Sequence, residues 1–439
     1  MKRWTKRRLY AAGIAMALGL GTLAGATSGA SAHVKATAAD VVTLNLESVN
    51  TVQNAWEAVI PDFEAKYPDI HINATYLNSA TSSALLAAQI QAGNAPDVYS
   101  ASAGTGTSTS IWPLAANGKL LALTGTPLVK ELPKSGVLPH SYKGQVYGFP
   151  MAVSTNGIFY NTTLFKQLKL KVPTTLSQVY TLCKTIKADG KIPIALGFAG
   201  NTTNIGVMLL QLENEFVYGQ NRNWVVDRES STSRVTFANT PGWRALFQFV
   251  FNLSSDGCFG TDPAGISYPT GAGNLVASGQ AVMEFLSGGT INSVTSINPN
   301  IPYAMFEVPP DNSGKHTVAS IGYNLSVAAN ALTKYPAQVK TFLDFVGGPD
   351  DAKWALNAAS ISPENLTKGI FPSYLAASDA PLAKKGRLSL NQGILLPYPT
   401  VNTALNNDLE GIITGQQTVS GALTDLDDAW NAAAAAANN

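Results

Sequence analysis

Residue types that carry acid–base, metal or phosphate chemistry are sparse in this chain of 439 residues. No two of the four histidines stand four positions apart, as the zinc ligands of a metalloprotease helix do. They are His33, His71, His140 and His316. The sequence contains neither a Gly-x-Ser-x-Gly nucleophile elbow nor a phosphate-binding P-loop. We therefore predict no catalytic residue, no metal site and no cofactor.

Carboxylates are the remaining candidates for catalysis. Glu47, Glu284 and Glu307 fall near the ends of predicted strands, and two carboxylates brought together in such places could cleave a glycosidic bond. A secreted carbohydrate-active enzyme therefore stays open as an alternative. The three aspartates of residues 425–428 could bind a metal ion, but their place in the last predicted helix favours a solvated helix face.

The other polar residues suit a different task. Only 13% of the residues are charged while 45% are hydrophobic, and Ser, Thr, Asn and Tyr are frequent. Sugars present many hydroxyl groups and apolar C–H faces, which neutral amides, hydroxyls, a few carboxylates and aromatic rings can match. The composition of this core-forming chain is therefore compatible with sugar binding.

The first part of the chain predicts elements that could position such groups. Apolar-rich strands are predicted at 41–48, 70–76 and 95–102, with amphipathic helices at 51–66 and 82–93. This β-α-β-α-β order implies a parallel sheet. Ligands of such sheets bind beyond the carboxyl ends of the strands. The candidate ligand-binding residues at those ends are Ser48, Asn50, Ser100 and Ser102.

The N-terminus predicts export. Basic residues precede an apolar run from Leu9 to Leu23, and small residues at 30–32 match a cleavage site, so residues 1–32 are predicted to be a signal peptide. An uncleaved anchor is the alternative. This segment holds five of the 29 basic residues and no acidic ones, so the rest of the chain has 24 Lys and Arg and 28 Asp and Glu. Such a balance predicts no nucleic acid or anionic membrane as partner.

Two cysteines, Cys183 and Cys258, are too few for a framework of several disulfides. Cys183 shares an apolar helical face with Leu182 and Ile186, which favours a buried free thiol, although a bridge to Cys258 stays open in an oxidising compartment. Neither cysteine is near residue 33, so no lipid-attachment cysteine follows the predicted signal peptide. We expect an exported protein that is extracellular, at the cell surface or periplasmic.

Several segments carry a family resemblance. GQVYGFPMAVSTNGIFYN at 144–161 predicts two strands joined by a short polar linker, as where a chain crosses between lobes. FEAKYPDIHIN, AGNAPDVYSASA and the closing TGQQTVSGALTDLDDAWN match the same family's opening and closing patterns. In the order and spacing of such segments over residues 41–430, the chain resembles the extracellular (family 1) solute-binding proteins of ABC sugar importers, which include the maltose- and oligosaccharide-binding proteins.

The resemblance implies an α/β, two-lobed periplasmic-binding-protein-like fold with a hinge and an inter-lobe cleft. The chain would cross between the lobes near residues 150–156, 300–308 and 342–350, and residues 41–150 would not share one continuous sheet with residues 156–300. The lobes would comprise residues 41–151 and 305–345 on the N-terminal side and residues 152–304 and 346–439 on the C-terminal side.

The resemblance also implies further ligand-binding residues. Ser154 lies in the first crossover, Gly288 and Gly289 form a glycine loop, and Tyr323 and Tyr398 occupy positions that often contact ligand. The tryptophan that commonly follows this loop for stacking is absent here. For each tyrosine, packing in the protein interior is the alternative.

Hydrophobic helical faces predict that Trp56, Trp243 and Trp354 are core residues. Asp97, in an Ala-Pro-Asp-Val segment, is predicted to anchor a turn.

The function implied by the resemblance is capture of an extracellular carbohydrate, in particular an oligosaccharide, by hinged lobe closure. The partners would be the carbohydrate ligand and the membrane permease subunits of an ABC transporter. We expect the protein to be a monomer, and we expect it to have no enzymatic activity. One alternative is another small polar solute, such as a polyol or glycerol phosphate, bound by the same fold. The other is the secreted carbohydrate-active enzyme named above.

Overall fold

The computed structural model describes residues 41–437 except 106, 133, 231–233, 349–350, 359 and 392–394. The chain divides into Met1–Asp40 and a second unit, Val41–Asn439, and only the second unit contains described residues. The predicted signal peptide at residues 1–32 lies outside the described residues. None of the helices in the described part of the second unit is long and apolar enough to cross a membrane.

The opening β-α-β-α-β prediction is confirmed. β1 (Val42–Val49), α1 (Gln53–Lys66), β2 (Ile70–Leu77), α2 (Ser79–Ala92) and β3 (Val98–Ala101) follow one another in this order. β1 lies between β2 and β3 and pairs with both in parallel. Alternating burial along β1 and β2 matches the alternation of apolar and polar residues in the sequence.

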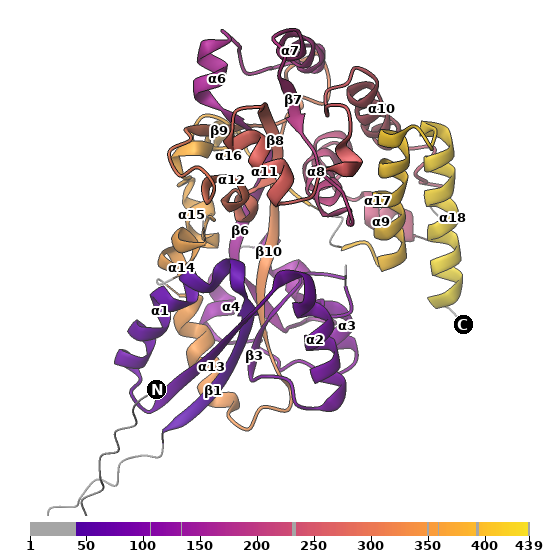
Figure 1. Ribbon diagram of the computed structural model, residues 1–439. Helices are drawn as coiled ribbons and strands as arrows, with labels where there is room; N and C mark the ends of the chain where they lie inside the picture. The colour runs from indigo at the N-terminus through magenta and orange to yellow at the C-terminus, as the bar shows by residue number, and fades with distance from the viewer. Residues whose placement is uncertain are drawn as a thin grey trace, which may run out of the picture. The chain divides into compact units, whose positions relative to one another are not determined.

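Two long strands connect this first strand group, β1–β3, with a second. β6 (Gly148–Asn161) pairs antiparallel with β10 (Ala319–Ala329), and β10 also pairs with β3. The second strand group contains β7 (Ile192–Ala195), β8 (Ala281–Ser287) and β9 (Tyr303–Phe306), of which β8 and β9 pair with β6. The order in the sheet is β2-β1-β3-β10-β6-β8-β7, and Figure 1 shows β6 and β10 running between the two groups.

Two expectations about this region are wrong. The polar linker expected within 144–161 is the middle of β6, because Ser154, Thr155 and Asn156 pair with residues of β10. For the same reason residues 41–150 and 156–300 share one hydrogen-bonded sheet instead of two separate ones. The ladder between β6 and β10 is irregular, however, with register shifts between Gly322 and Ser326.

The buried apolar side chains nevertheless gather separately around the two strand groups. One core cluster contains Leu44, Trp56 and Phe63 together with Phe342 and Trp354. A second, larger cluster brings the helices after β6 together with the last two helices. The prediction that Trp56, Trp243 and Trp354 are core residues is confirmed, with at most 1% of each exposed.

The remaining helices surround both strand groups. The longer ones are α7 (Leu176–Ala188), α8 (Thr203–Glu213), α10 (Pro241–Ser255), α11 (Thr270–Ala277), α13 (Pro336–Val346), α17 (Pro399–Thr414) and α18 (Val419–Ala437). The shorter ones are α3 (Ile111–Ala116), α4 (Pro127–Glu131), α5 (Lys134–Val137), α6 (Thr162–Gln167), α9 (Trp224–Glu229), α12 (Asn292–Thr295), α14 (Asp351–Asn357), α15 (Pro363–Lys368) and α16 (Asp379–Lys384), with short turns η1–η6 between them. The minor strands are β4 (Ser141–Tyr142), β5 (Gln145–Val146) and β11 (Leu388–Leu390).

Cys183 and Cys258 form a disulfide with a Cα–Cα distance of 5.7 Å. The free thiol favoured for Cys183 is therefore wrong. The buried face of α7 that carries Cys183 packs against the turn after α10, which carries Cys258. The spacing of apolar residues within α7 could not reveal this contact.

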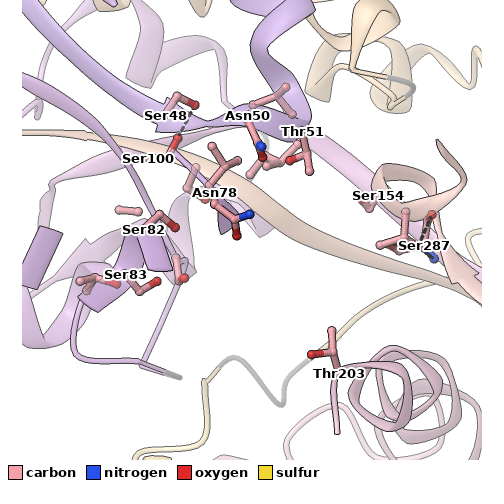
Figure 2. A pocket seen from close by; sticks show the side chains of 18 of the residues that line it. Ser48, Asn50, Thr51, Asn78, Ser82, Ser83, Ser100, Ser154, Thr203 and Ser287 are labelled. Atoms are coloured by element: carbon pink, nitrogen blue, oxygen red, sulfur yellow. Dashed lines mark hydrogen bonds between the residues drawn. The ribbon is translucent and has the colours of Figure 1, made fainter. Parts of the chain in front are cut away.

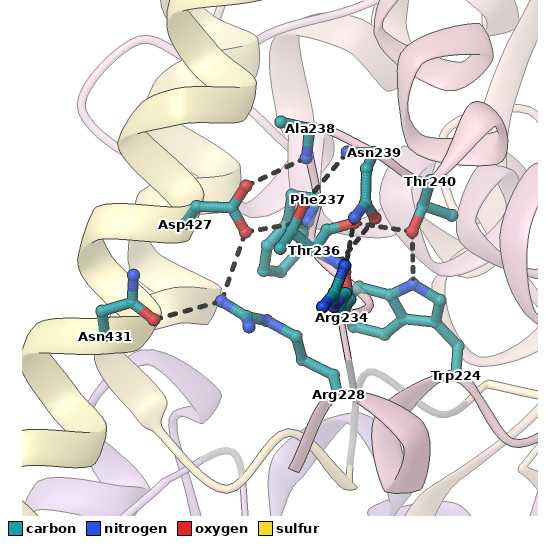
Figure 3. A network of polar contacts seen from close by, with 10 residues as sticks. All are labelled: Trp224, Arg228, Arg234, Thr236, Phe237, Ala238, Asn239, Thr240, Asp427 and Asn431. Carbon is teal, nitrogen blue, oxygen red and sulfur yellow. Dashed lines mark hydrogen bonds and ion pairs between the residues drawn. The ribbon is translucent and has the colours of Figure 1, made fainter. Parts of the chain in front are cut away.

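The aspartates of α18 also differ from expectation. Asp427 is not on a solvated face, because its carboxylate accepts hydrogen bonds from the backbone N–H groups of Phe237 (2.8 Å) and Ala238 (3.0 Å). It also pairs with Arg228 at 3.3 Å (Figure 3). Asp425 and Asp428 are exposed as expected. The last helix is thus fixed to the segment before α10.

Candidate ligand-binding site

A pocket of about 860 Å³ is lined by residues that come from both strand groups. Its first side is formed by the carboxyl ends of β1 and β3 and by α2, and its second side by the start of α8 and the end of β8. Figure 2 shows hydroxyl-bearing and amide side chains around this space. They include Ser48, Asn50, Asn78, Ser83, Ser100, Ser154, Thr203 and Ser287.

The first side of the pocket is held by the core beneath it. Ser48 ends the buried part of β1, and its hydroxyl oxygen accepts a hydrogen bond of 2.9 Å from Nε1 of Trp56. The hydroxyl groups of Ser48 and Ser100 are 2.8 Å apart, which joins the ends of β1 and β3. Asn50, the residue directly after β1, is exposed. The parallel pairing of β1 and β3 therefore delivers these groups to one edge, as the sequence predicted.

The second side depends on a turn and a helix start. Ser287 ends β8, and its hydroxyl oxygen accepts a hydrogen bond from the backbone N–H of Thr290. The hydroxyl oxygen of Thr290 accepts one of 2.9 Å from the backbone N–H of Ser287, so both hydroxyl groups are fixed. Thr203 begins α8. Ser154, from the middle of β6, lies at the base of the pocket with 1% of its surface exposed.

A second pocket of about 620 Å³ adjoins the first. The two share Ser102, Thr203, Val207 and Leu210 as lining residues. The second pocket alone is lined by Glu213 from the end of α8, Tyr323 from β10, Asn391, and the amide side chains of Asn402 and Asn406 from α17. The two pockets therefore adjoin along shared residues, and together they are called the cleft below.

The electrostatic character of the cleft is neutral to acidic. As far as the structure describes the lining of the two pockets, it contains no Lys, Arg or His and two acidic residues, Glu47 and Glu213. Glu47 accepts a hydrogen bond of 2.9 Å from Nε2 of Gln89. Burial raises the pKa of Glu213 to about 8, because the charged form loses its hydration there.

The carboxylates considered for glycoside cleavage are not brought together. Only Glu47 lines one of the two pockets. Glu284 is fully buried in β8, where burial raises its pKa well above the usual range. Glu307 is 4% exposed and accepts a hydrogen bond of 2.9 Å from Gln211. Of these three carboxylates, only Glu47 is therefore among the described residues that line the cleft.

Buried acids lie behind the cleft instead. Glu215, Glu307 and Asp379 neighbour one another, and burial raises the pKa of each, that of Asp379 to about 7. Glu215 accepts a hydrogen bond of 3.1 Å from the backbone N–H of Val318, beside β10. These groups belong to the interior that supports the crossover strands and do not line either pocket.

Most of the predicted ligand-binding residues meet in the cleft. Ser48, Asn50, Ser100, Ser102 and Ser154 line the first pocket, and Ser102 and Tyr323 line the second. Gly288 and Tyr398 are not among the described lining residues of either pocket, although Ser287 and Thr290, beside the glycine loop, line the first. The predicted role of Gly289 lies outside what the structure describes. The ring of Tyr398 contacts that of Trp430 edge-on, with 5.2 Å between the ring centres.

Sequence reasoning missed Thr203, Tyr268 and Glu213 as lining residues. A Gly-Asn-Thr-Thr-Asn run before an apolar segment signals the start of α8, and could have placed Thr203. Glu213 lies three residues beyond Leu210 on the same helix, so helical spacing could have placed it beside that lining residue. Nothing local singles out Tyr268.

Comparison with known proteins gives consistent results. A family model described as "Bacterial extracellular solute-binding protein" matches residues 49–353. A segment of 154 residues is 30% identical to the "Multiple sugar-binding protein" of Streptococcus mutans, and covers 33% of this chain and 34% of that protein. The "sn-glycerol-3-phosphate-binding periplasmic protein" of Rhizobium meliloti is 24% identical over 313 residues, which are 67% of this chain and 69% of that protein.

Solved structures share the fold. A "Chitin oligosaccharide binding protein" superposes with a TM-score of 0.70 at 20% identity, over 90% of this chain and 100% of the other. A solute-binding protein in complex with raffinose gives 0.69 at 20% identity, over 89% and 99%. The match over nearly the whole length supports the two-lobed α/β architecture.

Proposed function

Because the chain belongs to the family of bacterial extracellular solute-binding proteins, we propose that it captures an oligosaccharide and delivers it to the permease of an ABC importer. The observation that carries this proposal is the cleft lined from both strand groups by hydroxyl and amide side chains, with no cationic side chain among its described lining residues. Such a lining matches a neutral ligand with many hydroxyl groups.

The ligand class follows from charge. One relative is named for binding sn-glycerol-3-phosphate, and a phosphate ester carries negative charge at neutral pH. A phosphate is usually bound by Arg or Lys, which can form charge-assisted hydrogen bonds with it. The described residues that line the two pockets include neither Arg nor Lys, and two of them are acidic. A neutral sugar is therefore the better match.

Capture would use closure of the two lobes. The site residues proposed here are Ser48, Asn50, Ser100, Ser102, Ser154 and Tyr323, joined by Thr203 and Ser287. Because they come from both strand groups, a ligand that contacts both stabilises the closed state, which a permease could then recognise. The division at residues 151/152, 304/305 and 345/346 remains our proposal for the lobe boundaries.

The proposal also includes export of the protein and binding of the ligand without a chemical reaction. The basic and apolar start of the sequence would direct the chain out of the cytoplasm. With only one carboxylate of the predicted set at the cleft, binding without chemical change is the expected activity.

A thermal-shift panel tests this function. Purified protein is heated with maltose, xylan, raffinose and chitin oligosaccharides, with sn-glycerol-3-phosphate as the matched charged solute. A ligand at 100 times its Kd should stabilise the native state by about 2.7 kcal/mol. Chromatography should then recover the sugar unchanged. If sn-glycerol-3-phosphate alone stabilises the protein, its ligand is a phosphorylated solute and not a sugar. Recovery of cleaved sugar would show that the protein is an enzyme.

A further inference from the structure

The second pocket is a groove between two helices. Thr203, Gly206, Val207, Leu210 and Glu213 line it at spacings of three and four residues, so they form one face of α8. α17 packs against α8 and contributes Asn402 and Asn406, which are four residues apart.

The absence of a side chain at Gly206 keeps the groove open. A Cβ atom at this position would lie 3.2 Å from Oδ1 of Asn406, closer than most such contacts. Nδ2 of Asn406 donates to the backbone carbonyl of Asn402 at 2.8 Å, which orients the amide. The two helices therefore present an ordered amide group beside the helix face that ends in Glu213.

Glu213 is the unusual residue of this groove. Its side chain is only 3% exposed, yet it lines the groove. It is the one acidic residue among the described residues that line this groove. A carboxyl group in that position can exchange a hydrogen bond with a hydroxyl group of a bound ligand.

We propose that the groove binds an additional sugar unit of a linear oligosaccharide, and that Glu213 determines specificity there by donating a hydrogen bond to an oxygen of that unit. This inference rests on the proposed function. It extends that function by assigning a minimum ligand length and a specificity-determining residue outside the first pocket.

The protonation state of Glu213 is consistent with a donor. Burial raises its pKa to about 8, so the carboxylic acid is mostly protonated at neutral pH. The titratable side chains near it are Tyr218, whose raised pKa partly reflects the Glu213 charge, and Tyr323 in the same pocket. α17 faces it with amides, whereas Asp408 on that helix is influenced by Asp425.

The expected pH dependence has a definite sign. If the ligand binds only the protonated acid, affinity is full below the pKa and falls as pH rises through it. With a pKa of about 8, the protonated fraction falls about tenfold between pH 7 and pH 9. A ligand too short to reach the groove should not show this loss.

Titration calorimetry of the full exported chain tests the inference. The di-, tri- and tetrasaccharides of the maltose, xylose and N-acetylglucosamine series are titrated at pH 7 and pH 9. In the series that binds, the longer members should bind more tightly at pH 7 and lose about tenfold in affinity at pH 9. The disaccharide should change little. Equal affinities of all lengths, or equal pH dependence of all lengths, would overturn the inference.

Two variants isolate Glu213. Glu213→Gln keeps the size and an N–H donor but does not titrate, so it should bind the longer sugar within a few-fold at pH 7 and lose the pH dependence. Glu410→Gln, on α17 outside both pockets, is the matched control and should keep it. A pH dependence unchanged in Glu213→Gln would overturn the role of Glu213. If no saccharide of any length binds the wild type, the proposed function itself fails.

Discussion

Nε1 of Trp56 donates a hydrogen bond of 2.9 Å to the hydroxyl oxygen of Ser48, so a core indole and a cleft serine depend on one another. Trp56 is fully buried, and Ser48 in turn meets Ser100 at 2.8 Å. The edge of the cleft is therefore set by the packing of α1 on the sheet.

Replacing Ser48 should reduce stability as well as binding. In Ser48→Ala, Nε1 of Trp56 loses its partner in a buried place, which should lower the free energy of unfolding by about 1–3 kcal/mol. Urea denaturation measures this change. Ser83→Ala, at an exposed position of the same pocket, is the control and should leave the unfolding midpoint in place. Equal midpoints for both variants would show that the hydrogen bond contributes nothing.

The two tyrosines predicted at the site should now behave differently. Tyr323 lines the second pocket, so Tyr323→Ala should weaken binding of the preferred sugar about tenfold, a change of about 1.4 kcal/mol. Tyr398 packs on Trp430 outside both pockets, so Tyr398→Ala should lower the melting temperature and leave affinity unchanged. Calorimetry and thermal unfolding on both variants separate the effects.

Trp243→Ala serves as the core control for that comparison. Its ring packs among Tyr218, Trp224 and Phe237, and the truncation should cost about 3–5 kcal/mol of stability. Folded Trp243→Ala should still bind sugar. If Trp243→Ala folds normally but does not bind sugar, and Tyr323→Ala binds normally, the ligand must contact a different side of the cleft.

The disulfide should contribute substantially to stability. It closes a loop of 75 residues between α7 and the turn after α10, for which loop-closure entropy predicts about 4 kcal/mol. We expect Cys183→Ala with Cys258→Ala to unfold at a clearly lower urea concentration than the wild type. Wild type treated with a thiol reductant should approach the variant, and the reductant should not affect the variant. A variant as stable as the oxidised protein would contradict this expectation.

Glu284 should make stability depend on pH. Burial raises its pKa in the folded state well above that of the unfolded chain, and neither carboxyl oxygen has a hydrogen-bond partner within the described residues. The folded state therefore holds a proton that the unfolded state releases above its ordinary pKa. Stability should fall as pH rises between the two values, by up to about 1.4 kcal/mol per pH unit.

Glu284→Gln removes this titration. The variant should gain stability relative to the wild type as pH rises from 5 to 8, measured by urea denaturation at each pH. Glu57→Gln, on the surface of α1, should run parallel to the wild type. A constant difference between Glu284→Gln and wild type would mean that Glu284 does not titrate in this range.

Local patterns predicted some parts of the structure and not others. β1, β2 and β3 were predicted because each alternates or concentrates apolar residues between clear turns, and their shared edge followed from parallel pairing. Asp97 was predicted to anchor its own turn, but its carboxylate accepts hydrogen bonds from the backbone N–H of Asn45 and from the hydroxyl group of Thr333. It thus joins segments that are distant in sequence, which the local pattern did not reveal.

The missed features depend on contacts distant in sequence. The polar residues at the centre of β6 look like a linker because their partners lie in β10, more than 160 residues away. Cys183 looks like a core thiol until α10 is placed beside α7. Glu213 and Asn406 become neighbours of one groove only when α17 packs on α8. No pattern within a single segment contains that information.

The clustering of Trp56 and Phe63 with Phe342 and Trp354 has a consequence for how the protein is made. During synthesis, the first strand group emerges long before the residues that complete its core. A nascent chain must therefore leave these aromatic rings uncovered until nearly all of the polypeptide has been translated. Such delayed closure would keep the polypeptide unfolded enough to be threaded through a secretion channel, and would make it a client for chaperones that cover exposed apolar surface.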